Sequence, residues 1–373
     1  MRSREFLREV KGITARSHHP HPEAAVQAAE AEGAEAAQAA GAAVPAASEM
    51  EITYLGEHIL QWHITHRCNL RCAHCYQSEY ASEMSGEELF PALDIYERFL
   101  KEKHLHGHIN LTGGEPLVHP DFFIFSREIR RRNMDLGILT NGTLIDREKA
   151  KLIAELRPLF VQVSLDGTRR IHNSVRGRGS FERAIRGIDR LKKEGVCVHV
   201  SFTAQRTNLN QLRPLARVCR AHKVDKLWFD RVVIPSDEDR SGLSLTTEEY
   251  KKLVETAGKL QARGLVSCSR ALQFLGCEKS ECYRCGAGEN LLIFLADGGI
   301  MPCRRLPFVI GNIRDGELKD ILENSETMQS LANAPVPKDC LSCRYSEKCM
   351  GGAKCVTYAQ TGRLFAKDVN CWL

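Results

Sequence analysis

Three cysteines stand close together in the chain, and their spacing could support metal chemistry. Three residues separate Cys68 from Cys72 and two separate Cys72 from Cys75, in a segment just after the strand-like run 59–64. Soft thiolate ligands favour iron–sulfur clusters or zinc. Three ligands on a four-iron cluster leave one iron open for a substrate or cofactor. A structural zinc site would want a fourth ligand, for which the two histidines of this segment are available.

Cysteines also gather near the C-terminus. Of the 15 cysteines, three lie in the opening segment and nine lie from Cys277 onward. The first ten residues, Met1 to Val10, are charged and contain no apolar stretch typical of a secretory signal. We therefore expect a cytoplasmic protein whose clustered cysteines serve metal or redox centres rather than disulfides.

Composition argues against several other classes of protein. The chain has 373 residues, a net charge of +5 and 43% hydrophobic residues. No apolar run approaches the roughly 20 residues of a membrane span, so we expect no membrane partner. The mild charge gives no reason to expect nucleic acid. Residues 1–50, rich in alanine from Ala24 to Ala47, are predicted to be a disordered tail without chemistry.

From Glu51 the pattern becomes an alternation of strands and helices. Six strands are predicted at His58–Ile64, His108–Thr112, Leu136–Thr140, Phe160–Leu165, Val196–Thr203 and Lys226–Phe229. Helices are predicted between and after them at Ser85–Lys103, Phe122–Arg132, Asp146–Leu156, Phe181–Glu194, Asn210–Ala221 and Thr246–Arg263. This order implies an α/β fold with a parallel sheet and right-handed crossovers, although periodicity alone does not separate an open sheet from a partial barrel.

A smaller cysteine-rich domain should follow the α/β domain. A hairpin over Leu291–Leu295 and Ile300–Met301, and a helix at Leu318–Glu323, are the elements predicted there. The predicted organisation is a tail at 1–50, a core domain at 51–265 and a small domain at 266–373.

Candidate binding residues follow the predicted strands. Gly113 and Gly114 would let backbone approach a ligand closely, and Glu115 offers an acceptor for an ammonium group. The other candidates at or after strand ends are Asn141, Ser164 and Arg176. Each of these signals is weak alone, since Asn-Gly and Asp-Gly are common turns.

The CxxxCxxC spacing, with Gly-Gly-Glu-Pro about 40 residues later, resembles the radical S-adenosylmethionine (SAM) enzymes. The resemblance implies a partial (β/α)6 TIM-like barrel with its chemistry at the carboxyl ends of the strands. It implies that Cys68, Cys72 and Cys75 hold a [4Fe–4S] cluster whose open iron chelates SAM. One electron would then release a 5′-deoxyadenosyl radical, chemistry that belongs to the cofactor.

The resemblance also implies roles for the candidate residues. His74 occupies the position before the third cysteine that is aromatic in the family, and the Gly113–Glu115 segment would hold the amino group of SAM. Asn141 and Ser164 resemble positions near the ribose and the methionyl carboxylate, and Arg176 could pair with that carboxylate.

The C-terminal cysteines resemble the SPASM extension of this family, which typically houses two auxiliary [4Fe–4S] clusters. Carried over, Cys285, Cys303 and Cys355 would serve the first, with Cys282 or Cys277 as a fourth ligand. The second would use Cys340, Cys343, Cys349 and Cys371. Five residues separate Cys349 from Cys355 where the family has three, which puts Cys355 in doubt and leaves the first cluster open or incomplete. Zinc would use the same cysteines.

Together these features favour an enzyme that modifies a ribosomally made peptide or protein by crosslinking, thioether formation or epimerisation. A reducing donor such as flavodoxin or ferredoxin is implied. Tetrapyrrole side-chain chemistry is an alternative that the residues do not discriminate. Sulfatase maturation is disfavoured, because Arg304 stands where those relatives carry an aspartate base; Arg304 could instead bind an acidic substrate group or face solvent. A non-catalytic cluster protein is disfavoured by the Gly-Gly-Glu-Pro segment.

Overall fold

The computed structural model describes residues 56–75, 82–234, 239, 242–277 and 280–373. The alanine-rich tail predicted at residues 1–50 lies outside these ranges.

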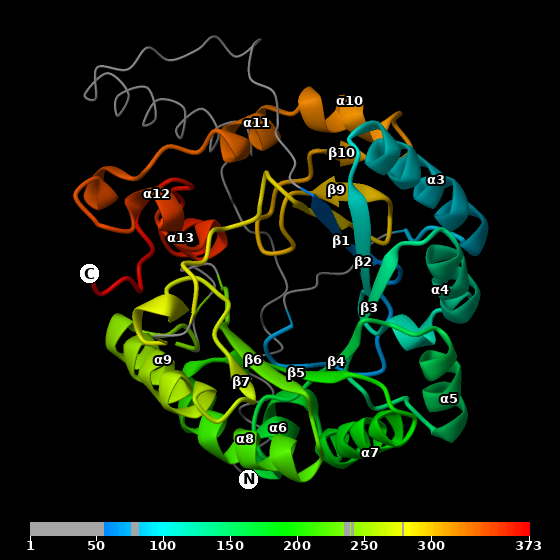
Figure 1. The fold of residues 1–373 in the computed structure, drawn as a ribbon, viewed down its shortest axis with the longest axis horizontal. Helices are drawn as coiled ribbons and strands as arrows, with labels where there is room; N and C mark the ends of the chain where they lie inside the picture. The colour runs from blue at the N-terminus through cyan, green and yellow to red at the C-terminus, as the bar shows by residue number, and fades with distance from the viewer. Residues whose placement is uncertain (1–55, 76–81, 235–238, 240–241, 278–279) are drawn as a thin grey trace.

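A curved sheet of ten strands organises the chain (Figure 1). Its central six strands run parallel and in sequence order, which confirms the predicted α/β class and parallel sheet. These strands are β1 (Glu57–His63), β2 (His106–Thr112), β3 (Asp135–Thr140), β4 (Phe160–Ser164), β5 (Val198–Ala204) and β6 (Lys226–Arg231).

Helices cover the outside of this sheet (Figure 1). They are α3 (Gly86–Glu102), α4 (Phe122–Arg131), α5 (Arg147–Glu155), α6 (Arg169–Arg176), α7 (Ser180–Lys193), α8 (Leu212–Ala221) and α9 (Thr247–Gln261). The predicted cap of the first helix is present, because the side chain of Ser85 accepts a hydrogen bond from the amide of Glu88 and Glu88 returns one. Among the described helices, none is both long and apolar enough to cross a membrane.

The two faces of the sheet differ in character. Trp62 of β1 points outward, where its ring packs edge-on against Phe125 of α4 and Phe294. Alternate residues of the strands point inward. At the amino-terminal half of the strands the inward rings of Phe160 and His199 stack with centroids 4.6 Å apart, and His108 packs against Phe160 at 5.9 Å. These rings fill the amino end of the barrel, which leaves the carboxyl ends for a site.

The C-terminal region continues the same sheet. β8 (Leu291–Phe294) pairs in parallel with β1, and β9 (Gly299–Met301) and β10 (Gly311–Asn312) extend it antiparallel. The predicted hairpin is therefore present. Four helices follow, α10 (Leu318–Glu323), α11 (Glu326–Ala332), α12 (Ser346–Cys349) and α13 (Lys354–Thr361).

Several short elements were not predicted from the sequence. Helix α6 is one, because Arg169–Arg176 is strongly polar and short. Strand β7 (Val266–Ser267) is another; it pairs with β6 at the far edge of the sheet, so the sheet of the core domain runs two residues past the predicted boundary at 265. The division of the chain into domains otherwise stays a prediction.

The buried His58 should make folding stability depend on pH. Burial lowers its pKa from 6.5 to about 3. Below pH 6.5 the imidazole of His58 is therefore protonated in the unfolded chain but stays neutral in the folded chain. Stability from this group is therefore present above pH 6.5 and lost as the pH falls. Between pH 7.5 and 5.5, the free energy of unfolding of the wild type should fall by about 1.4 kcal/mol more than that of His58→Phe. Denaturant titrations at both pH values measure this. His106→Phe, whose imidazole is 48% exposed, is the control and should follow the wild type.

Candidate active site and cysteine groups

The first three cysteines lie in the loop after β1, here called the cluster loop (residues 64–75). Cys68 and Cys72 are partly buried and Cys75 is exposed. The amide of Cys75 donates to the carbonyl of Cys72 at 3.2 Å, and the amide of Leu70 donates to Cys68 Sγ at 3.4 Å. Burial raises the pKa of Cys72 to about 11, and the neighbouring Cys75 and Cys68 thiols add to that rise. The three thiols therefore lie in one loop and act on one another electrostatically, although no three His, Cys, Asp or Glu side chains among the described residues are arranged to hold a metal ion as they stand.

Gly113 and Gly114 bring the end of β2 against this loop. A Cβ on Gly113 would stand 2.1 Å from the carbonyl oxygen of Thr65, and one on Gly114 would stand 2.3 Å from that of Arg67. Hydrogen bonds join the two segments. The amide of Gly114 donates to the carbonyl of Thr65 at 2.8 Å, and the amide of Glu115 donates to the carbonyl of Arg67 at 2.9 Å. We expected these glycines to let the backbone approach a ligand. In this structure they let the end of β2 pack closely against the backbone of the cluster loop.

Glu115 lies deeper than expected for an ammonium acceptor. Its side chain has no exposure, and it accepts hydrogen bonds from Thr140 Oγ1 and the Asn141 amide, both at 2.7 Å, and from the Leu117 amide at 3.3 Å. Burial raises its pKa to about 7, against the pull of these donors. Glu115 therefore joins the ends of β2 and β3, and its contact with the amino group of SAM stays a prediction.

Asn141 and Ser164 stand at the ends of neighbouring strands, as predicted. Asn141 Nδ2 donates to Asn69 Oδ1 at 2.9 Å and lies 4.0 Å from Cys68 Sγ, so it reaches the cluster loop. Ser164 is the last residue of β4, partly buried and in register with Ser201. Their contacts with SAM remain predictions.

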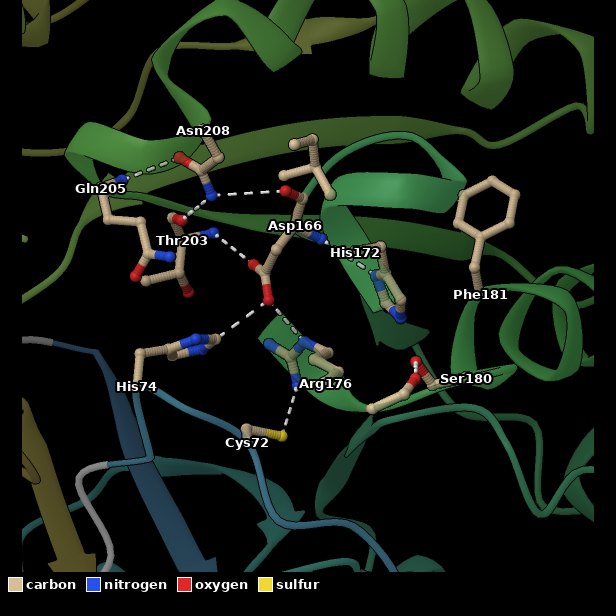
Figure 2. Close-up of polar contacts among 12 residues, drawn as sticks. Cys72, His74, Asp166, His172, Arg176, Ser180, Phe181, Thr203, Gln205 and Asn208 are labelled. Carbon is tan, nitrogen blue, oxygen red and sulfur yellow. Dashed lines mark hydrogen bonds and ion pairs between the residues drawn. The ribbon is translucent and has the colours of Figure 1, made fainter. Parts of the chain in front are cut away.

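Asp166 is the centre of a polar network that sequence reasoning did not identify (Figure 2). Its carboxylate, which has no exposure, accepts from Arg176 Nε at 2.5 Å and from the Thr203 amide at 3.1 Å, and His74 Nε2 lies 3.7 Å away. Burial alone would raise the pKa of Asp166, but the Arg176 charge and His74 outweigh it and hold the pKa below its usual value. Asp166 is thus an anion with a fixed partner.

Arg176 and His74 connect this network to the cysteines. Arg176 Nη1 lies 3.9 Å from Cys72 Sγ, so the guanidinium bridges Asp166 and the cluster loop. Burial lowers the pKa of His74 to about 4, so its ring is neutral at pH 7 despite the nearby carboxylate. We expected Arg176 to pair with the carboxylate of SAM; in this structure its partner is Asp166, and its contact with SAM is left as a prediction.

The first C-terminal group joins Cys285, Cys303 and Cys355, as predicted. Cys303 and Cys355 hydrogen bond through their side chains, Cys285 acts on Cys303 electrostatically, and all three are buried in one cluster. The longer spacing before Cys355 is absorbed at Met350, Gly351 and Gly352. These have φ values of 50°, 82° and 91°, which turn the chain sharply before α13.

The fourth ligand predicted for this group is placed elsewhere. Cys277 forms a disulfide with Cys268. Cys282 lies within hydrogen-bonding distance of Cys349, a member of the second group. The resemblance implied Cys282 or Cys277 as the fourth ligand of the first group, and that assignment stays a prediction.

The second C-terminal group surrounds a small cavity. Cys340, Cys343, Cys349 and Cys371 line it together with apolar side chains that include Phe274 and Tyr345. The four predicted ligands are therefore brought together, with Cys282 beside them. Their assignment as cluster ligands stays a prediction.

Arg304 stands directly after Cys303 and is partly buried. Burial lowers the pKa of His63, the last residue of β1, to about 3, and the charge of Arg304 lowers it further. Its neighbour Arg305 instead pairs with Asp230 at 2.6 Å.

The donor type suits iron–sulfur clusters, because thiolates are the ligands that such clusters use and each group offers three or more cysteines that form no disulfide. The cluster loop groups three sulfurs, as a cluster with one open iron needs. Two family models match the chain: the Radical SAM superfamily over residues 62–210, and the SPASM iron–sulfur cluster-binding domain over residues 285–344. The chain is a radical SAM enzyme with a C-terminal SPASM domain. Its cofactors are [4Fe–4S] clusters and SAM.

Known proteins of this family resemble the chain over most of its length. Fe-coproporphyrin III synthase of Methanosarcina barkeri is 27% identical, over 84% of this chain and 88% of that protein. Mycofactocin maturase MftC of Mycobacterium tuberculosis is also 27% identical, over 84% of this chain and 82% of its own. A solved structure of anSMEcpe with bound AdoMet and the Cp18Cys peptide is 22% identical, with a TM-score of 0.68 over 84% of this chain and 93% of that one. The fold is therefore shared with that structure.

Replacing Asp166 by alanine should loosen Arg176 and, through it, the cluster loop of this radical SAM site. The change leaves the Arg176 charge buried without its main partner, and breaking such a pair typically costs about 3–5 kcal/mol. We expect a lower free energy of unfolding, and a broadened electron paramagnetic resonance (EPR) signal of the reduced cluster, because Arg176 and His74 are no longer fixed against the loop. Asp146→Ala, at the exposed start of α5, is the control for general surface effects. An unchanged EPR signal in Asp166→Ala would contradict the positioning role.

Proposed function

We propose that this enzyme modifies a side chain or α-carbon of a ribosomally made peptide or protein. The observation that carries the proposal is the combination of one three-cysteine loop at the barrel mouth with two further cysteine groups in the same chain. Auxiliary clusters beside the radical site suit reactions in which a substrate radical must lose an electron or a substrate must be held. The likeness to a mycofactocin maturase, and the peptide bound to anSMEcpe, support a peptide as substrate.

The residues of this chain divide the work. When bound, the cluster and SAM supply the 5′-deoxyadenosyl radical that removes a hydrogen atom from the substrate. Cys68, Cys72 and Cys75 would hold the cluster. Asn141 and Arg176 would orient the loop and the SAM beside it, and the His108, Phe160 and His199 rings close the amino end of the barrel against water.

Tetrapyrrole modification is the second candidate. It is favoured by the likeness to Fe-coproporphyrin III synthase, which is as high and as extensive as the likeness to the maturase. Sulfatase maturation is less well supported, because an arginine side chain offers no proton acceptor and cannot serve as the base at the position of Arg304. The electron for either reaction would come from a flavodoxin or ferredoxin.

Replacing the three cluster-loop cysteines by alanine should abolish reductive cleavage of SAM. No thiolates would remain to hold the cluster that binds it. Iron analysis of the anaerobically reconstituted protein should fall by about four irons per chain, with the C-terminal groups unaffected because they share no cysteine with the loop. The measurement is 5′-deoxyadenosine by liquid chromatography. Cys197→Ala is the matched control, since Cys197 contacts His199 and belongs to none of the groups. Undiminished 5′-deoxyadenosine in the triple variant would reject the assignment.

The substrate class can be tested directly. Short peptides encoded beside this gene should lose hydrogen or gain a crosslink when incubated with the reduced enzyme and SAM, as mass spectrometry would detect. Loss of carbon dioxide from a porphyrin propionate, with the peptides unchanged, would favour the tetrapyrrole reading instead.

A further inference from the structure

Arg231, the last residue of β6, carries a buried charge that the activity described above does not use. Its side chain is 1% exposed and pairs with that of Asp368, which has no exposure. Nη1 of the arginine donates to Asp368 Oδ1 at 2.7 Å, and Nη2 donates to Oδ2 at 2.9 Å. The guanidinium also lies over the ring of Tyr250 in α9, 4.2 Å from the ring centroid. Arg231 is therefore fixed on the core domain and holds Asp368 through two parallel hydrogen bonds.

The surroundings of Asp368 suit a carboxylate anion. Besides the two bonds from Arg231, it accepts hydrogen bonds from the backbone amides of Ala353 and Asn370, both at 3.0 Å. All four of these groups are N–H donors, so they match an acceptor-only carboxylate and leave no acceptor for a protonated carboxyl. A carboxylate removed from water needs a partner of opposite charge. Arg231 supplies that charge.

One bond of Asp368 holds the helix that carries Cys355. Ala353 is the N-cap residue of α13, and Cys355 lies in the first turn of that helix. Asp368 accepts the amide of this N-cap residue, a bond that a side chain of the helix itself makes in a capping box. The approach is close, since a Cβ on Gly352 would stand 2.6 Å from Asp368 Cβ. The start of α13 is therefore held against Asp368.

The segment that follows Asp368 carries Cys371. The backbone carbonyl of Asp368 accepts a hydrogen bond from the amide of Cys371 at 2.8 Å. Between them, Asn370 Oδ1 accepts from Arg231 Nη1 at 2.8 Å, and Asn370 Nδ2 donates to the carbonyl of Leu245 at 2.9 Å. Residues 368–371 are therefore bound to the core domain at two successive polar side chains, directly before the cysteine.

We propose that Arg231 is a positioning residue for the auxiliary clusters. Through Asp368 it holds the segments that carry Cys355 and Cys371, one predicted ligand from each C-terminal cysteine group. Without the guanidinium the carboxylate would take up a proton or turn towards water, and the two backbone amides bound to it would lose their acceptor. The inference goes beyond the proposed function and does not depend on which substrate the enzyme modifies.

The test counts the iron that the C-terminal groups bind. In the full-length chain with the three cluster-loop cysteines replaced by alanine, iron bound after anaerobic reconstitution comes from these groups alone. Adding Arg231→Met should lower iron and sulfide per chain at least about twofold, with a matching loss of the EPR signal of the reduced clusters. Arg231→Lys keeps the charge but not the paired donors, so it should retain part of the iron. It also covers the case in which Arg231→Met fails to fold.

Two comparisons separate positioning from general stability. Arg132→Met removes a guanidinium that is 11% exposed and pairs with Glu128 and Glu97 within the core domain, so it should lower stability without loss of iron. In Arg231→Met/Asp368→Leu the unpaired carboxylate is gone, and the free energy of unfolding of the metal-free chain should rise relative to Arg231→Met. Iron should stay low in this double variant, because the two amides still lack their acceptor.

Four results would overturn the inference. They are undiminished iron in Arg231→Met, an equal loss of iron in Arg132→Met, recovery of iron together with stability in the double variant, and no iron at all in the parent chain without cluster-loop cysteines. Failure of the proposed function is distinguishable, because neither a peptide nor a porphyrin enters these measurements.

Discussion

A buried charge constrains the whole radical site. The carboxylate of Asp166 is removed from water, so it needs a partner of opposite charge and donors for its remaining lone pairs. Arg176, at the end of α6, provides the opposite charge, and the backbone amide of Thr203 in β5 provides a hydrogen-bond donor. The backbone carbonyl of Asp166 accepts a hydrogen bond from Asn208 at 3.3 Å. The ion pair between Asp166 and Arg176 therefore links the end of β4 to α6, and the guanidinium of Arg176 extends that link to the cluster loop.

The large elements were predictable because their physical signals are local. Apolar runs separated by turns gave the six central strands, and Ser85 with Glu88 marked a helix start that the structure has. The grouping of most cysteines was also predictable, through the resemblance. What spacing could not give is the direction of a side chain. Arg176 was expected to meet a ligand, yet it folds back onto Asp166, whose Asp-Gly context reads as an ordinary turn.

Contacts between distant segments were harder to foresee. Cys282 is near Cys285 in sequence but lies within hydrogen-bonding distance of Cys349. The doubt over Cys355 came from counting residues without their backbone angles; positive φ values at Met350, Gly351 and Gly352 bring it to Cys303.

The pairing of β8 with β1 makes the C-terminal region a structural part of the barrel rather than an appendage. Four residue pairs join the two strands, and Arg231 at the end of β6 holds Asp368 through hydrogen bonds of 2.7 and 2.9 Å. The region is therefore tied to the first and the last of the six central strands. A chain cut before β8 would leave the edge of β1 with unpaired amide and carbonyl groups. Such an edge favours strand pairing between molecules. The cysteine-rich segment thus also covers the edge strand of the barrel.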